Sequence, residues 1–227
     1  MRFREDPLRM LMAIRFDCQL DDFKIEQNTY TSICRNAKLL ENVSKERIKE
    51  EFNKILLSDL PNTGICLLDT TNLLPLISPS LCKCYGFEQN KYHLFNVLGH
   101  TRCVLRFVKP DLILRLAAFY HDIGKPQSLT VDENGERHFY GHELISEQIA
   151  REELKALKYD NKTIDEVCLL VRGHMDLLNL NLSEKSIRKL LNKYGEELLW
   201  KLIDLREADM KGTGIQYFRK IEEEIEN

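Results

Sequence analysis

The chain has 227 residues, with 33 basic and 36 acidic side chains and a net charge of −3. Hydrophobic residues make up 43% of the chain, which is enough for a core, and the near balance of charges excludes nucleic-acid binding through a uniformly basic surface. No apolar run approaches the roughly 20 residues that a membrane helix needs, and the charged N-terminus is unlike a secretory signal. We therefore expect a cytoplasmic protein with no membrane partner.

The first part of the chain predicts three helices. Asp6 before Pro7 is typical of a helix start, because Asp is a good cap and Pro is tolerated in the first turn. We expect this helix over residues 6–19, a second over residues 29–40, and a third after Ser44. The predicted apolar face of the first helix consists of Leu8, Met12 and Phe16. That of the third consists of Ile48, Phe52, Ile55 and Leu56.

Residues 61–64, with the sequence PNTG, predict a break in the chain. We place the domain boundary here, between a helical neck of residues 1–62 and a larger domain of residues 63–227. Beyond the break, the apolar spacing predicts a helix over residues 94–107 and another that begins at Pro110-Asp111 and ends at His121-Asp122.

The later sequence contains one strand-like segment, in which Asn134-Gly135 predicts the turn of a short β-hairpin. Helical patterns then resume. Thr163 and Glu166 have the spacing of a capping box, Gly195 interrupts the next pattern, and a charged helix ends the chain. The fold class that these patterns predict is all-α: a helical bundle with a small N-terminal helical neck and one short hairpin.

Histidine and aspartate recur in a fixed order through the larger domain, and all 6 histidines lie between His93 and His174. These two residue types are the usual ligands of a catalytic divalent metal. A lone histidine in a helix is more often a packing residue, and we interpret His93 and His138 in that way. Six residues of the series are too regular for this explanation and predict a metal centre: His100, His121, Asp122, His142, His174 and Asp209.

His121 and Asp122 are adjacent, and neighbours on a regular helix point about 100° apart. They can therefore reach one metal only near a helix end, which Gly124 indicates. His142 and His174 could bind a second metal or a substrate phosphate.

The catalytic residues that we expect are Asp122 and Lys125. Lys125 follows Gly124, where a turn could direct its ammonium group to the substrate phosphate.

The order His, His-Asp, His, His, Asp, with HDIGK at its centre, resembles the HD superfamily of metal-dependent phosphohydrolases. The resemblance implies an α-helical domain with one or two divalent metals, acting on phosphomonoesters, phosphodiesters or nucleotides. The identity of the metal stays open among Mn, Ni, Mg, Fe and Co. By resemblance, the core ligands are His100, His121, Asp122 and Asp209. His142 and His174 match the additional histidines of members with two metals, and Lys125 matches the lysine of the HDxGK subgroup.

The N-terminal stretch FREDPLRMLMAIRF resembles the neck motif of bacterial tRNA CCA-adding enzymes and poly(A) polymerases, and VSKERIKEEFNKIL resembles their next motif. The resemblance implies that Asp6 and Arg9 hydrogen-bond an incoming nucleotide base, with Glu5 directly before them. A purely structural alternative stays open, in which Asp6 only caps a helix.

In those enzymes, a head domain that carries the polymerising metals precedes the neck, whereas this sequence starts at the neck with Met1. We therefore expect a metal-dependent phosphohydrolase that uses a metal-activated water on nucleotides or RNA 3′ ends, by 2′,3′-cyclic phosphodiester or phosphomonoester hydrolysis. The alternative is a tRNA-binding body that works with a separate nucleotidyltransferase head. A hydrolase of cyclic nucleotides in signalling or defence is a third reading.

Overall fold

The computed structural model describes residues 2–90, 93–178 and 183–213. The charged helix that we predict at the end of the chain lies outside these residues. The described part is built from helices and one two-stranded antiparallel sheet, so the predicted all-α class is confirmed. Within the described ranges, no helix is both long enough and apolar enough to cross a membrane.

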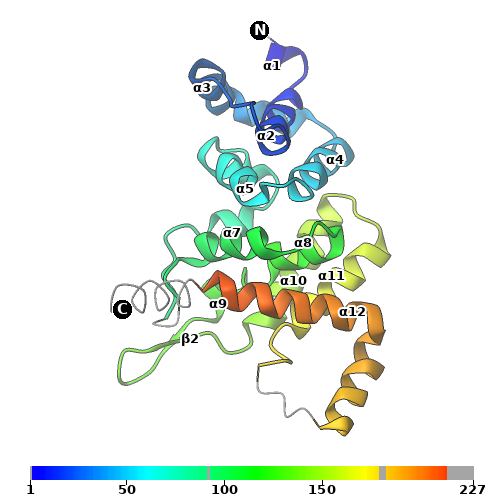
Figure 1. The fold of residues 1–227 in the computed structure, drawn as a ribbon. Helices are drawn as coiled ribbons and strands as arrows, with labels where there is room; N and C mark the ends of the chain where they lie inside the picture. The colour runs from blue at the N-terminus through cyan, green and yellow to red at the C-terminus, as the bar shows by residue number, and fades with distance from the viewer. Residues whose placement is uncertain (1, 91–92, 179–182, 214–227) are drawn as a thin grey trace, which may run out of the picture.

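The neck lies at one end of the molecule, shown in blue at the top of Figure 1. Its helices are α1 (Arg2–Glu5), α2 (Arg9–Gln19), α3 (Gln27–Asn36), the 3₁₀ helix η1 (Ala37–Asn42) and α4 (Lys45–Leu56). Helix α2 packs against both α4 and α5, the helix that follows the neck. The predicted stripe of the third helix is confirmed, because all four of its residues are fully buried in α4.

The start and the buried face of α2 differ from the prediction. The helix begins at Arg9, because Asp6 to Leu8 form a turn in which the Asp6 carboxylate accepts the Leu8 N–H. Leu8 is buried, but Met12 and Phe16 are only half-buried. The residues that α2 does bury are Met10, Leu11, Ile14, Asp17 and Cys18. The physical reason is that α2 has two helical neighbours, so its buried face is wider than one stripe and is turned away from the predicted one.

The predicted break at residues 61–64 is wrong, because α5 (Pro61–Thr70) runs straight through it. Pro61 occupies the first turn, where a proline is tolerated. Gly64 sits inside the helix because a Cβ there would collide with the Ile55 side chain of α4. A glycine that sequence rules assign to a turn thus permits a close helix–helix approach. The division of the chain at residue 62 stays a prediction.

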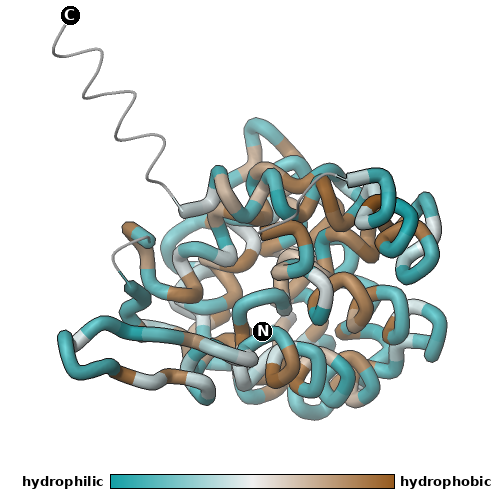
Figure 2. Tube along the Cα trace, turned by 90° about the horizontal axis from the view of Figure 1, so that it is seen from below, coloured by the Kyte–Doolittle hydropathy of each residue, from teal (hydrophilic) through white to brown (hydrophobic). Residues whose placement is uncertain are grey.

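Short elements, η2 (Leu74–Leu76) and α6 (Pro79–Cys82), connect the neck to the larger domain. The helices of that domain are α7 (Val97–Phe107), α8 (Leu112–Tyr120), α9 (Lys125–Ser128), α10 (His142–Ala156), α11 (Asn161–Gly173) and α12 (Glu184–Gly212). In Figure 2 the hydrophobic segments gather between the helices and the hydrophilic segments face outward. Helices α8 and α12 pack on each other, each of them packs on α7 and α11, and α10 packs on α8 and α11.

The hairpin is confirmed where the sequence predicts it. Strand β1 (Thr130–Val131) pairs antiparallel with β2 (Arg137–His138), and Thr130 lies opposite His138. The hairpin extends from the helical body beside the ends of α9 and α12 (Figure 1). It therefore forms a wall next to the region where several helix ends meet.

Helix starts agree with the sequence at some caps and differ at others. Asp111 caps α8 by accepting the Leu114 N–H. The capping box of Thr163 and Glu166 is wrong, because α11 begins earlier and its cap is Asp160, which accepts both the N–H and the hydroxyl of Thr163. The predicted interruption at Gly195 appears as a kink in α12, where φ is 71°.

Candidate metal centre

Five helices bring the predicted His and Asp residues to one buried place. His100 comes from the middle of α7, and His121 and Asp122 directly follow α8. The other three are the first residue of α10, the residue after α11 and a residue near the end of α12: His142, His174 and Asp209. All six residues are at most 8% exposed, so the site lies inside the bundle.

Four of these residues form a first group: His100, His121, Asp122 and Asp209. The Nε2 atom of His100 lies 3.0 Å from Asp209 Oδ1, 3.2 Å from His121 Nε2 and 3.3 Å from Asp122 Oδ2. Three or four such atoms around one point are the donor set of a divalent cation.

The second group contains His142, His174 and again Asp122. His142 Nε2 lies 3.2 Å from Asp122 Oδ1 and 3.1 Å from His174 Nε2. The two carboxylate oxygens of Asp122 therefore face different groups: Oδ2 faces the first and Oδ1 faces the second. Asp122 would therefore contribute one oxygen to each of two cation sites.

The hydrogen bonds of the histidine Nδ1 atoms indicate whether the Nε2 atoms, which face the centre of the site, can bind a metal. The Nδ1 atoms of His121, His142 and His174 lie 2.8, 2.7 and 2.6 Å from backbone carbonyls, so each Nδ1–H donates to a carbonyl. In a neutral ring this leaves an unprotonated Nε2. Nitrogen lone pairs then face one another about 3.1 Å apart in the second group, which is unfavourable unless a cation lies between them. The residues thus fit a divalent metal, and carbonyl-bonded Nδ1 atoms are typical of metal-binding histidines.

The electrostatics of the site keep its carboxylates ionised. Burial alone would raise the pKa of Asp122, but the charges of Lys125 and His121 hold it well below its usual range. Burial likewise opposes ionisation of Asp209, and hydrogen bonds from His100 and His121 hold the pKa of that carboxyl well below its usual range.

The histidines of the site differ from one another. Burial lowers the pKa of His174 to about 3. Burial also opposes the charged form of His121, but Asp122 and Asp209 outweigh it and raise the pKa of that ring. The site thus combines anionic carboxylates with at least one imidazole that stays neutral, as metal ligands require.

Lys125 differs from the expectation that its ammonium points at substrate. Its Nζ lies 2.6 Å from Asp122 Oδ2 and 2.7 Å from Gln89 Oε1, and His93 Nε2 is 3.4 Å away. The ammonium is buried, with the side chain 7% exposed. Lys125 therefore neutralises Asp122 in this structure, and its contact with a substrate phosphate stays a proposal.

A cavity of about 440 Å³ opens over the two groups. Its wall includes Tyr140 from the hairpin segment, His93 and Arg206, which sequence reasoning did not assign to the site. Arg206 Nη1 lies 2.7 Å from Asp209 Oδ2. Its spacing of three residues before a predicted ligand on the same helix was a signal that could have identified it. His93, interpreted from sequence as a packing residue, lines this cavity.

The predicted nucleotide-binding residues lie elsewhere, at the neck end of the molecule (Figure 1). Arg9 pairs with Glu5 at 3.7 Å, and Asp6 pairs with Arg47 at 3.2 Å. Asp6 is not the residue that caps α2, since it precedes the helix by three positions and organises the turn instead. All three motif residues thus lie in the neck, and none of them lines the cavity over the metal centre.

Two family profiles match neighbouring parts of the sequence. The first is described as "Probable RNA and SrmB- binding site of polymerase A" and matches residues 22–84. The second is the HD domain and matches residues 91–210, which is more than half of the chain. The chain belongs to the HD-domain family. All six residues of the two buried ligand groups lie within this match.

Similarity to known proteins covers nearly the whole chain. The chain is 32% identical over 220 residues to the CC-adding tRNA nucleotidyltransferase of Thermus thermophilus, and the alignment covers 92% of this chain and 50% of that protein. It is 30% identical to the A-adding tRNA nucleotidyltransferase of Deinococcus radiodurans, with the same two coverages. A shorter stretch of 72 residues is 50% identical to the CCA-adding enzyme of Pediococcus pentosaceus, covering 32% of this chain and 18% of that enzyme. The chain thus spans about half the length of the first two relatives.

The neutral state of His174 predicts a pH dependence of stability in the metal-free protein. An unfolded histidine has a pKa near 6.5, whereas the folded ring has one of about 3. As the pH falls below 6.5, the unfolded state takes up the proton first, so this residue makes the folded state less stable in acid. From pH 7.5 to pH 5.0 the loss should be about 2 kcal/mol, since one pKa unit is worth about 1.4 kcal/mol.

Two neighbours affect the same curve. His121, with its raised pKa, contributes stability that is present below pH 6.5 and lost at higher pH, opposite in sign to His174. The contribution of His174 is therefore measured by comparing two proteins. The free energy of unfolding in urea is determined for EDTA-treated wild type and for His174→Asn, each at pH 7.5 and pH 5.0. The variant should lose about 2 kcal/mol less than wild type. Equal losses would show that His174 is not held neutral in the folded protein.

Proposed function

We propose that the chain is the RNA-binding body of a CCA-adding-type tRNA nucleotidyltransferase, which holds tRNA for a nucleotidyltransferase head. The observation that carries this proposal is the match of residues 22–84 to an RNA-binding family directly before an HD domain. The alignment with two tRNA nucleotidyltransferases over 92% of the chain supports the same assignment. The net charge of −3 requires that RNA contacts come from local basic sites.

The neck motif gives this body a role in nucleotide selection. The side chains of Glu5 and Arg9 are 71% and 43% exposed, and those of Arg47 and Asp6 are 52% and 31% exposed. Exposed ion pairs contribute at most about 1 kcal/mol, so these side chains can exchange their present partners for a nucleotide base at little cost. Asp6 and Arg9 thus have both accessibility and freedom to act as a base-reading pair.

The proposal is tested with a tRNA transcript that lacks its terminal CCA. We expect salt-dependent binding of the transcript, measured by fluorescence anisotropy, and labelled C or A incorporation when a head domain is added. Arg9→Ala should lower the amount of nucleotide incorporated or cause the wrong nucleotide to be incorporated, while the affinity for tRNA changes little. Arg188→Ala removes an arginine that is paired with Glu184 on α12, and it should leave both readouts unchanged. Absence of tRNA binding by the wild type, or of any effect of Arg9→Ala on incorporation, would contradict the proposal.

A second candidate function is favoured by one specific observation, the pair of buried ligand groups that share Asp122. We propose that this centre hydrolyses phosphate esters at nucleotides or RNA 3′ ends. A bound divalent metal would supply Lewis-acid polarisation of the phosphate and an activated water. Lys125 and Arg206, both on the wall of the 440 Å³ cavity, would bind the phosphate oxygens, and Tyr140 would cover the site from the hairpin side.

The second candidate is tested by hydrolysis of 2′,3′-cyclic AMP and of a generic phosphomonoester. The protein is stripped with EDTA and then supplied with Mn, Ni or Mg. Turnover that disappears with EDTA and returns with metal would support a hydrolase, and Arg206→Gln should then raise KM. Metal uptake without turnover on either compound would restrict the centre to a structural role, and the RNA-binding assignment would be unaffected.

A further inference from the structure

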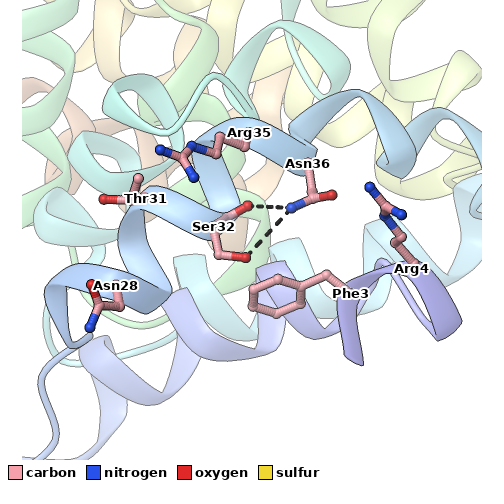
Figure 3. Close-up of a pocket in the computed structure, with 7 residues that line it drawn as sticks. All are labelled: Phe3, Arg4, Asn28, Thr31, Ser32, Arg35 and Asn36. Atoms are coloured by element: carbon pink, nitrogen blue, oxygen red, sulfur yellow. Dashed lines mark hydrogen bonds between the residues drawn. The ribbon is translucent and has the colours of Figure 1, made fainter. Parts of the chain in front are cut away.

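A polar pocket of about 510 Å³ lies in the neck, between α1 and α3 (Figure 3). Neither the metal centre nor the neck motif of Glu5, Asp6 and Arg9 contributes to its lining. The residues that line it are Phe3, Arg4, Asn28, Thr31, Ser32, Arg35 and Asn36. None of them is acidic, although acidic residues outnumber basic ones in the chain as a whole.

The two arginines of this pocket differ from other arginines of the neck. Arg15 is bonded to Glu51 at 2.8 Å and Arg47 to Asp6 at 3.2 Å, so their charges are neutralised. Arg4 and Arg35 are exposed, and among the described residues neither side chain forms an ion pair or a hydrogen bond. They come from different elements, α1 and α3, and line the same space. Two unneutralised guanidinium groups at one pocket attract an anion, and the planar fork of arginine suits phosphate oxygens.

The remaining lining suits the rest of a nucleotide. The Asn36 amide is held in place, because its Nδ2 donates to the Ser32 carbonyl at 2.7 Å (Figure 3). The half-buried Phe3 ring lies beside these polar groups and offers a flat apolar surface. Aromatic rings bind nucleic-acid bases by stacking, and amides and hydroxyls bind their edges or the ribose. The pocket volume lies within the range of about 300–1,000 Å³ that small-molecule sites have, so one nucleotide fits.

We propose that this pocket binds one nucleotide of the RNA, with Arg4 and Arg35 paired to its backbone phosphates and Phe3 against its base or ribose. The proposal rests on the RNA-binding function proposed above and names a place where that binding occurs. Helix α3 lies inside the stretch of residues 22–84 that matches the RNA-binding family. The site is distinct from the base-reading pair, whose side chains are not part of the pocket lining.

The test compares two double variants that remove the same charge. Arg4→Gln with Arg35→Gln removes the two pocket cations, and Lys185→Gln with Arg188→Gln removes two exposed cations of α12, far from the neck in Figure 1. Binding of the tRNA transcript is measured by fluorescence anisotropy over a salt series. The slope of log K against log salt is negative, and each lost phosphate contact should make it less steep by about 0.7–0.9. The slope of the pocket variant should therefore be less steep than that of wild type by about 1.4–1.8, and its affinity at 0.1 M salt should be about 30-fold weaker. The α12 variant should match wild type.

Two further variants separate charge from stacking and from misfolding. Arg35→Lys keeps the positive charge and should keep most of the salt slope. Phe3→Leu should weaken binding without changing the slope, because the contact that it removes carries no charge. Thermal unfolding should be the same for the arginine variants and wild type, since Arg4 and Arg35 have no partners to lose among the described residues. If wild type binds the transcript and the pocket variant binds it with the same affinity and salt slope, this inference alone is overturned. If wild type does not bind the transcript, the proposed RNA-binding function and this site are both overturned.

Discussion

Replacing Asp122 with alanine should abolish divalent metal binding by the protein. Its Oδ2 lies 3.3 Å from His100 Nε2 and its Oδ1 lies 3.2 Å from His142 Nε2, so one side chain contributes to both ligand groups. We expect one or two metal ions per chain in wild type and none in Asp122→Ala, measured by mass spectrometry of the metal after dialysis against Mn or Ni. His142→Ala removes a ligand from the second group only, and it should keep the first metal.

The same substitution should destabilise the metal-free protein. Lys125 Nζ lies 2.6 Å from Asp122 Oδ2 in a buried place, so the alanine variant leaves a buried ammonium without its counter-charge. Breaking a buried ion pair in this way costs about 3–5 kcal/mol. Urea unfolding of EDTA-treated protein should show this loss, and a double variant with Lys125→Met should recover most of it. Wild-type metal content in Asp122→Ala would show that the carboxylate does not bridge the two groups.

Gly124→Ala should disturb both the fold and the second ligand group. A Cβ at this position would lie 2.5 Å from the His142 carbonyl oxygen and 2.7 Å from the Ser146 backbone nitrogen. Both atoms belong to the backbone of α10, so the start of that helix has to move, and His142 moves with it. Overpacking of this kind costs about 1–3 kcal/mol, occasionally more. We expect a loss of about 3 kcal/mol, at the upper end of this range, measured by urea unfolding, and weaker metal uptake by the second group.

Gly99→Ala is the matched control for this substitution. Gly99 lies in the first turn of α7, and the atom nearest to its new Cβ would be the Phe95 Cβ at 3.1 Å, so the neighbour has to move by only a few tenths of an ångström. Alanine is also a better helix former than glycine, which offsets part of this cost. The control should therefore be close to neutral. A Gly124→Ala variant as stable as this control would mean that α10 adapts without displacing His142.

Some features that depend on local sequence were predictable. Asp111 and Gly195 marked a helix start and a kink, because capping and glycine conformation act over a few residues. The Asn134-Gly135 turn identified the hairpin for the same reason. Packing between distant segments was not predictable in this way. The buried face of α2 depends on having two helical neighbours, and Gly64 continues a helix because Ile55 needs the space of its missing side chain.

The sequence by itself determined which residue types could form the candidate centre and in what order they occur, because metal-ligand chemistry is a property of the side chains. It also determined the helical class, through the periodicity of apolar residues. Only the tertiary structure decided how these side chains share space. It turned the two oxygens of Asp122 to different histidines, placed Lys125 against that carboxylate, and brought Arg206 to the cavity wall. These relations join five helices, and no local pattern records which helix ends will meet.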